Sequence, residues 1–252
     1  MINVLITGAT SGIGMACAKI FAANGYNLII TGRRQERLVA LQQHLKTTHG
    51  VKVLPLCFDV RNKEEAAAAF EKIKAKNLSI DILINNAGLA SGFGAIQDGN
   101  LTDWETMIDT NIKGLLYITK LTASIMIQQK SGHIINVASI AGKEAYPNGN
   151  VYCATKAAVD SLSKSMRIDL LPHNIRVCNI APGLVETEFS LVRYNGNEEL
   201  AANPYKNIHP LNGDDIADTI FWVATRPAHI NIADVYITPT AQANTRDVFR
   251  EG

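Results

Sequence analysis

The sequence has few of the features that mark secreted, membrane or metal-binding proteins. Its four cysteines form no CxxC pair and its six histidines are scattered, so neither a disulfide framework nor a metal site is indicated. No apolar run approaches the length of about 20 residues that a membrane-spanning helix needs. The first residues, Met1-Ile2-Asn3, lack a basic region followed by a cleavage site, so we expect no secretory signal and a cytoplasmic location. A net charge of +1 provides no strong field for nucleic acid or anionic membrane, and we expect neither as a partner.

What the chain does contain is enough apolar material for a large core, because 47% of its 252 residues are hydrophobic. Short and nearly continuous apolar runs are predicted to be strands, at residues 2–7, 27–31, 51–58, 80–85, 133–137, 175–180 and 232–237. Between them lie segments with a helical pattern, at residues 12–24, 35–49, 63–76, 102–129, 152–171 and 213–225.

Alternation of strands and helices predicts an α/β fold, a doubly wound Rossmann-type sheet of about seven parallel strands with helices on both faces. Strands that are buried on both faces of a parallel sheet are expected to be continuously apolar, as these are. No repeat or linker-like stretch is present, so we expect one domain over residues 1–252. The exception to the pattern is the segment 183–212, which is rich in Asn, Gly and Pro and has no strand pattern. An irregular insertion of this length is typically functional or mobile.

A glycine-rich stretch, Thr7-Gly8-Ala9-Thr10-Ser11-Gly12-Ile13-Gly14, follows the first predicted strand and begins the first predicted helix. Glycine permits a sharp turn and a close approach to a pyrophosphate, and a helix N-terminus directs free amide groups toward an anion. The spacing is Gly-x3-Gly-x-Gly rather than the commoner Gly-x-Gly-x2-Gly. An ordinary turn is the alternative interpretation. The position directly after the first strand favours a dinucleotide site that includes Gly8, Thr10, Ser11, Gly12, Ile13 and Gly14.

The second predicted strand ends in Thr31-Gly32-Arg33-Arg34, without an acidic residue. In dinucleotide folds that prefer NAD, a carboxylate about 20 residues after the glycines binds the ribose 2′-hydroxyl. Arginine can instead form two hydrogen bonds with a 2′-phosphate and stack on the adenine. We therefore predict NADP as the cofactor, with Arg33 as the first candidate for the phosphate and Arg34 as the second. The alternative is that both are solvated residues at a helix start.

Four polar residues are candidates for catalysis. Tyr152 and Lys156 lie four positions apart in a predicted helix and therefore share a face. A nearby cation lowers the pKa of tyrosine from about 10 toward the range that suits acid–base catalysis. Ser139 follows the fifth predicted strand at the edge where ligands bind, and its hydroxyl can hold a substrate oxygen. Asn111 lies inside a predicted helix, although asparagine is a poor helix former. Taken singly, the Tyr–Lys pair is common on amphipathic helices, Ser139 is typical of a turn, and Asn111 of a helix irregularity.

Taken together, these motifs resemble those of the short-chain dehydrogenase/reductase family in order and spacing. The matching motifs are Thr7 to Gly14, Asn85-Asn86-Ala87-Gly88, Asn111, Ser139, Tyr152-x3-Lys156 and Pro182-Gly183. The resemblance extends from the first strand to the helix near residue 225 and implies an oxidoreductase. In that family Tyr152 would be the acid–base group, and Lys156 would lower its pKa and bind the nicotinamide ribose. Ser139 would orient the carbonyl, and Asn111 would anchor a water that relays protons to Lys156.

The resemblance also implies further cofactor residues and an assembly. Asp59 and Val60 would hold the adenine. The lining of the cofactor cleft near the nicotinamide would include Asn86, Ala87, Gly88, Pro182, Gly183, Val185 and Thr187. The two long predicted helices would form a dimer face, so the resemblance implies a homodimer or homotetramer.

The loop at residues 184–194, with segments 32–37, 104–111 and 149–152, looks like the NADP-dependent 3-hydroxy acid dehydrogenase branch, which includes serine 3-dehydrogenases. That branch acts on serine, allo-threonine and related 3-hydroxy acids, and reduces malonic semialdehyde to 3-hydroxypropionate. Such substrates carry a carboxylate, for which a cation is suited; Arg193 is the first candidate and Lys143 the second. The alternatives are a 3-oxoacyl carrier-protein or general carbonyl reductase and, from another class, a non-catalytic NADPH-binding regulator. An intact Ser139, Tyr152 and Lys156 set weighs against the regulator.

Overall fold

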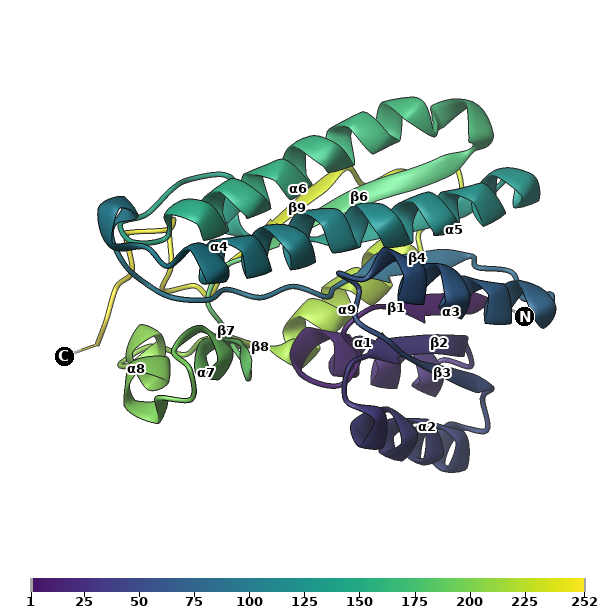
Figure 1. Cartoon of the computed structure of the whole chain (residues 1–252), viewed down its shortest axis with the longest axis horizontal. Helices are drawn as coiled ribbons and strands as arrows, with labels where there is room; N and C mark the ends of the chain where they lie inside the picture. Colours follow the sequence, from purple (N-terminus) through teal and green to yellow (C-terminus); the bar gives the residue numbers. More distant parts are fainter. Residues whose placement is uncertain (1, 252) are drawn as a thin grey trace.

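The computed structural model describes residues 2–251 and is built around a parallel sheet (Figure 1). The order of its strands across the sheet is β3 (Val53–Cys57), β2 (Asn27–Gly32), β1 (Asn3–Ile6), β4 (Ile82–Asn85), β5 (Gly132–Val137), β6 (Ile175–Pro182) and β9 (Asp234–Ile237). Each of the predicted apolar runs forms one of these strands. The predicted doubly wound α/β fold is therefore confirmed.

Helices cover both faces of this sheet, because neighbouring side chains of a strand point to opposite sides. In β1, for example, Val4 and Ile6 pack on one face and Leu5 packs on the other. The first face carries α1 (Gly12–Ala23), α2 (Gln35–His49) and α9 (Gly213–Ala224). The second face carries α3 (Lys63–Ala75), α5 (Leu115–Gln129) and α6 (Asn150–Asp169) (Figure 1). Burial on both faces explains why the strands are continuous apolar runs.

The helix predicted over residues 102–129 is interrupted. It consists of α4 (Leu101–Ile108), a π-helical turn (Asp109–Gly114) and α5. A π turn accommodates one more residue than an α turn and often occurs at a functional site. Gly114 permits close packing at the end of this turn, since a Cβ there would lie 2.8 Å from the Val60 side chain.

The insertion at 183–212 is more regular than expected. Its two ends form short strands, β7 (Val185–Glu186) and β8 (Leu211–Asn212), which pair with each other in parallel. Between them lie α7 (Phe189–Arg193) and α8 (Glu198–Ala202). The expectation of a strand-free segment was wrong at these ends, because two-residue strands are too short to show a periodic pattern. Short 3-10 helices complete the structure at Ile96–Asp98, Ile140–Gly142, Leu171–His173 and Asn203–Tyr205.

The sheet order places a crevice where the site was expected. The connections from β1 lead to β2 on one side, and the chain later returns to β4 on the other side of β1. In such a sheet, ligands bind beyond the carboxyl ends of the strands at this reversal point. Across residues 2–251, the structure contains no helix with the length and apolarity to cross a bilayer.

Candidate active site

A cavity of about 530 Å³ lies at the carboxyl ends of the strands. Most of the residues predicted for the site line it, whatever their place in the sequence. Those residues are Gly8, Thr10, Ser11, Gly12, Ile13, Arg33, Arg34, Asp59, Val60, Asn86, Ala87, Gly88, Ser139, Tyr152, Lys156, Pro182, Gly183, Val185, Thr187 and Arg193. Of the predicted site residues, Gly14, Asn111 and Lys143 are the ones that do not line the cavity.

The glycine loop has the shape that a dinucleotide pyrophosphate requires. Gly8 and Gly12 have φ angles of 67° and 49°, in the left-handed region that favours glycine. Gly14 lies behind the loop rather than on its surface, since a Cβ there would be 2.4 Å from both the Gly8 carbonyl oxygen and the Asn86 side chain. The loop therefore presents backbone to the cavity and the N-terminus of α1 beside it, which fits the phosphates of a dinucleotide.

Tyr152 and Lys156 project from the same face of α6 into the cavity, as their spacing predicted. Both side chains are buried, with 8% and 6% of their surface exposed. The Lys156 Nζ atom lies 5.9 Å from the centroid of the Tyr152 ring and donates a hydrogen bond of 3.0 Å to the Val137 carbonyl oxygen. The helix thus holds an ammonium group and a phenol together at the end of β5.

Burial dominates the electrostatics of this pair. It raises the pKa of Tyr152 above the usual value, and the neighbouring Tyr146 adds to this increase. A hydrogen bond with Ser139 and the charge of Arg193 act in the opposite direction. Burial also lowers the pKa of Lys156 to about 8. The expected lowering of the Tyr152 pKa is therefore not seen in the chain alone, which holds Tyr152 as a protonated phenol that can donate a proton.

Ser139 and Asn111 have their side chains fixed by the backbone around them. The Ser139 hydroxyl accepts a hydrogen bond from the Ala141 amide at 3.1 Å and so begins the 3-10 turn Ile140–Gly142. Asn111 lies in the π turn, where its amide group donates to the Leu89 carbonyl at 2.8 Å and its oxygen accepts from the Leu89 amide at 2.9 Å. Asn111 is 2% exposed and therefore shapes the cavity from behind.

At the other end of the cavity, the two candidate arginines are used differently. Arg33 is exposed, and its closest charged contact is with the Asp59 carboxylate, at 3.9 Å. The Asp59 carboxylate is held mainly by Arg61, at 2.6 Å, and this pairing lowers the pKa of Asp59 although partial burial opposes the change. Arg34 instead donates hydrogen bonds to Thr10, Ser11 and Glu188.

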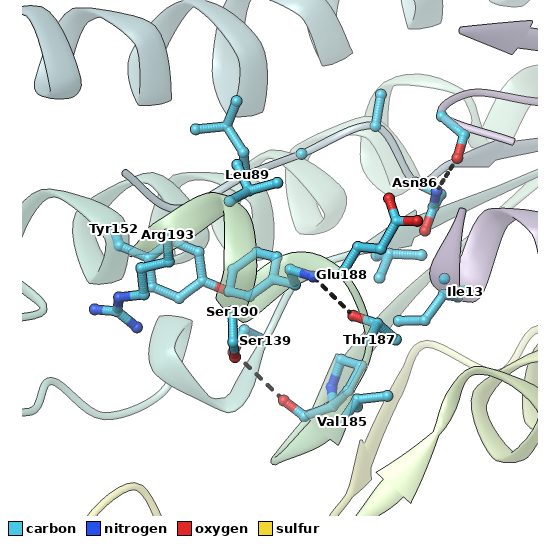
Figure 2. Close-up of a pocket in the computed structure, with 18 of the residues that line it drawn as sticks. Ile13, Asn86, Leu89, Ser139, Tyr152, Val185, Thr187, Glu188, Ser190 and Arg193 are labelled. Atoms are coloured by element: carbon cyan, nitrogen blue, oxygen red, sulfur yellow. Dashed lines mark hydrogen bonds between the residues drawn. The ribbon is translucent and has the colours of Figure 1, made fainter. Parts of the chain in front are cut away.

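Arg193 comes from α7 and lies over Tyr152. Its guanidinium carbon is 5.5 Å from the centroid of the Tyr152 ring and 4.8 Å from that of Phe93. One terminal nitrogen donates to the Tyr146 hydroxyl at 2.8 Å, whereas the buried Nε finds no hydrogen-bond partner within residues 2–251. Figure 2 shows Tyr152 and Arg193 together at one end of the cavity, with Thr187 and Ile13 toward the other.

Lys143, the second candidate for a substrate carboxylate, is directed elsewhere. Its ammonium group forms ion pairs with Asp160 at 2.5 Å and with Asp234 at 2.8 Å. Asn179 donates hydrogen bonds to the same two carboxylates. Two nearby carboxylates would repel each other without a cation, so Lys143 is occupied in joining α6 to β9. The structure therefore does not support its prediction as a substrate ligand.

Sequence reasoning missed the aromatic wall around Arg193. Tyr146, Phe93 and Phe189 line the cavity, and the Phe189 ring lies 5.7 Å from that of Tyr152. These residues lie in loops or short helices, where no periodic pattern marks them. Gly149 leaves room for the Tyr146 ring, since a Cβ at Gly149 would lie 2.3 Å from it. Within residues 2–251, no group of three or more His, Cys, Asp or Glu side chains could hold a metal ion.

Comparisons with known proteins agree with this geometry. Residues 3–196 match the family model described as short chain dehydrogenase. The chain is 46% identical over 241 residues to the NADP-dependent 3-hydroxy acid dehydrogenase YdfG of Salmonella typhimurium, covering 95% of this chain and 96% of the relative. It is 45% identical over 242 residues to the serine 3-dehydrogenase of Agrobacterium fabrum, covering 96% and 95%. Among solved structures, the closed form of serine dehydrogenase complexed with NADP⁺ superposes with a TM-score of 0.92 at 42% identity, covering 99% of this chain and 100% of that one.

Proposed function

The chain belongs to the short-chain dehydrogenase family, and on that premise we propose that it transfers hydride between NADP and small 3-hydroxy acids. The substrates would be of the serine, allo-threonine and 3-hydroxypropionate type, oxidised or formed at the 3-position. The observation that carries this proposal is the convergence of Ser139, Tyr152 and Lys156 with the glycine loop at one cavity. The names of the relatives support NADP and a hydroxy acid. They do not favour a carrier-protein or general carbonyl reductase, or a non-catalytic regulator.

Tyr152 would be the acid–base group. In the reducing direction its protonated phenol donates the proton to the carbonyl oxygen while that oxygen gains negative charge, and Ser139 holds the same oxygen. In the oxidising direction the phenol oxygen accepts the proton from the alcohol. The cofactor, when bound, supplies or accepts the hydride. Acid–base catalysis of this kind contributes about 10²–10⁴ in rate. Asn111 would act as a positioning residue that holds Leu89 and, with it, the neighbouring Gly88 next to the Lys156 ammonium group.

Arg33 would recognise the 2′-phosphate of NADP. Its side chain is 59% exposed, and its single ion-pair contact within residues 2–251 is long, at 3.9 Å, so its donors remain available. A guanidinium can form two parallel hydrogen bonds with a phosphate. Asp59 and Val60, at the end of β3, would flank the adenine on the same side of the cavity.

Arg193 would bind the substrate carboxylate. The cation is desolvated by the aromatic rings around it, and its unpartnered Nε is a buried donor that a carboxylate oxygen would satisfy. A hydrogen bond to a charged group is worth about 1.5–3 kcal/mol, and leaving a buried donor unpaired costs a similar amount. The position over Tyr152 places a bound carboxylate within a small molecule's reach of the proton donor.

The first test is Tyr152→Phe, assayed with NADPH and malonic semialdehyde and with NADP and 3-hydroxypropionate or serine. We expect NADPH to bind as in the wild type, because the ring is retained, and turnover to fall at least about 100-fold because the proton donor is lost. Near-normal turnover in the variant would contradict the assignment. Turnover of acetoacetyl thioesters in preference to hydroxy acids would instead indicate the carrier-protein alternative.

The second test is Arg193→Met, with Arg193→Lys as the charge-conserving control. For 3-hydroxy acids, the Michaelis constant is expected to rise about 10- to 100-fold in the Met variant. For a neutral ketone of similar size it should change little, because no carboxylate is present to be held. Equal effects on both substrates would show that Arg193 does not bind the substrate carboxylate.

Assembly, location and domain organisation belong to the proposal as well. We propose a homodimer or homotetramer, supported by exposed apolar side chains on the two long helical segments, such as Leu116 on α5 and Ile168 on α6. We propose a cytoplasmic location, in keeping with free cysteines at positions 17, 57, 153 and 178. The chain would function as one NADP-binding domain over residues 1–252, with residues 183–212 as its substrate loop.

A further inference from the structure

A cluster of opposite charges connects the substrate loop with the cofactor end of the cavity. The Glu188 carboxylate, at the start of α7, accepts a hydrogen bond from Arg34 at 3.0 Å. It also accepts two from Arg37, at 2.8 Å and 3.1 Å. Arg34 follows β2 and Arg37 lies in the first turn of α2, so these contacts join segments about 150 residues apart in the sequence.

Arg34 extends the connection to the glycine loop. Its Nη2 atom donates to the Thr10 hydroxyl at 3.0 Å and to the Ser11 hydroxyl at 2.9 Å, and its Nε donates to Thr10 at 3.3 Å. Every nitrogen of its guanidinium therefore has a protein partner, in contrast with that of Arg33. Arg34 therefore links the end of β2, the glycine loop and the substrate loop. It does not present free donors to a ligand.

This connection forms part of the cavity wall. Thr10, Ser11, Arg34 and Glu188 all line the same cavity as Tyr152. Thr187, next to Glu188, approaches the glycine loop so closely that a Cβ at Gly12 would lie 3.2 Å from its side chain. Figure 2 shows Glu188 and Thr187 on the substrate loop, near Ile13 of the glycine loop. A dinucleotide that enters the cavity would lie beneath this part of the loop.

The same short helix carries Arg193. Glu188 precedes α7 and Arg193 ends it, so one short helix connects the residue that holds the loop at the cofactor end with the residue over Tyr152. The Arg193 carbonyl also accepts a hydrogen bond from the Gly92 amide at 3.2 Å, which ties the far end of α7 to the segment after β4. The position of Glu188 therefore influences the position of Arg193.

We propose that Glu188 is a positioning residue whose ion pairs with Arg34 and Arg37 hold the substrate loop closed over the bound dinucleotide and Arg193 over Tyr152. The inference rests on the proposed function, because it takes NADP as the ligand of the cavity. All three charged side chains are about half exposed. Each pair therefore contributes modestly to the stability of the closed loop and is weakened by salt. We expect the loss of both pairs to speed cofactor release roughly threefold to tenfold.

A different role for Glu188 would have the opposite consequence. If its carboxylate occupied the place of the 2′-phosphate between the two arginines, it would compete with NADP for them. Removing the charge would then strengthen NADPH binding and leave NADH binding unchanged. A closing ion pair acts on the loop as a whole, so its removal speeds the release of both cofactors to the same degree.

The test measures the release of NADPH and of NADH from the full-length enzyme by stopped-flow fluorescence. The variant is Glu188→Gln, and the matched control is Glu186→Gln, because Glu186 lies in the same loop and forms no ion pair within residues 2–251. We expect release of both cofactors from Glu188→Gln to be about three to ten times faster, and release from Glu186→Gln to match the wild type. Raising the salt concentration should reduce the difference in NADH release rate between the wild type and Glu188→Gln, because NADH lacks the 2′-phosphate and its own charge pair with Arg33.

A double-mutant cycle with Arg37→Gln separates the ion pair from general loosening of the loop. If the pair acts as proposed, Arg37→Gln speeds release less than Glu188→Gln, since Arg34 remains, and the double variant behaves like Glu188→Gln alone. Additive effects, wild-type release rates in Glu188→Gln, or tighter binding of NADPH alone would each overturn the proposal. Unchanged release with normal hydroxy-acid turnover would refute only this inference, whereas a wild-type chain that does not bind NADPH would refute the proposed function too.

Discussion

The fully buried His133 on β5 predicts how the stability of this protein depends on pH. The side chain is 1% exposed, and neither ring nitrogen has a hydrogen-bond partner within residues 2–251. Burial, with a smaller contribution from the charge of Arg176, lowers its pKa from 6.5 to about 3. Folding therefore requires the neutral imidazole over the range in which the unfolded chain binds a proton.

The sign and size of the effect follow from these two pKa values. Above pH 6.5 both states are neutral and His133 adds no pH dependence. As the pH falls from 6.5 toward 3, the unfolded state takes up a proton that the folded state does not, so stability is lost at ~1.4 kcal/mol per pH unit. Lowering the pH from about 7.5 to about 5 should therefore remove ~2 kcal/mol through this residue alone.

The experiment compares urea unfolding of the wild type and of His133→Leu at several pH values and equal protein concentration. Leucine is similar in size and does not titrate, so the variant should be at least as stable near neutral pH, because two unpaired buried nitrogens are removed. It should also retain ~2 kcal/mol that the wild type loses by about pH 5. The exposed His229, replaced by Gln, is the matched control for the loss of a histidine at the surface. Parallel losses of unfolding free energy in the wild type and His133→Leu would refute the reasoning.

Contacts in and around the site lead to three other predictions. Arg33→Ala should raise the Michaelis constant for NADPH about tenfold and leave that for NADH unchanged, since the guanidinium would meet the 2′-phosphate; equal losses in initial-rate assays with both cofactors would contradict this. Gly142→Ala would place a Cβ 2.5 Å from the Lys156 carbonyl oxygen. It should displace the serine-bearing turn and lower turnover about tenfold or more, with NADPH affinity by fluorescence titration little changed. Lys143→Met should lower the free energy of unfolding by about 2 kcal/mol, because the buried Asp160 loses a cation; unaltered urea unfolding would show that the ion pair is dispensable.

The sheet and most of the residues that line the cavity could be predicted from the sequence, because both follow from local patterns. Strands such as β5 and β6 are buried on both faces, so their residues have to be continuously apolar. The glycine loop and the Tyr152–Lys156 spacing are local patterns, whose geometry is set by a few neighbouring residues. Local patterns of this kind are visible without knowledge of the rest of the chain.

The rest of the site depends on contacts between distant segments. Lys143 is close to Ser139 in sequence, but the carboxylates of Asp160 and Asp234 determine its direction. The raised pKa of Tyr152 results mainly from burial by surrounding elements, which the four-residue spacing to Lys156 does not reveal. The aromatic rings around Arg193 come from several loops that have no shared period.

The π turn that carries Asn111 has a consequence for how the chain tolerates insertions and deletions. A turn of this kind holds one surplus residue, so deleting a single residue from Asp109–Gly114 would allow α4 and α5 to merge into one uninterrupted α-helix. Such a shortened chain would gain regular backbone hydrogen bonds and lose the two hydrogen bonds between the Asn111 side chain and the Leu89 backbone. A deletion that makes the helix continuous would thus impair the enzyme. Selection for activity would preserve the π turn, whereas selection for stability alone would remove it.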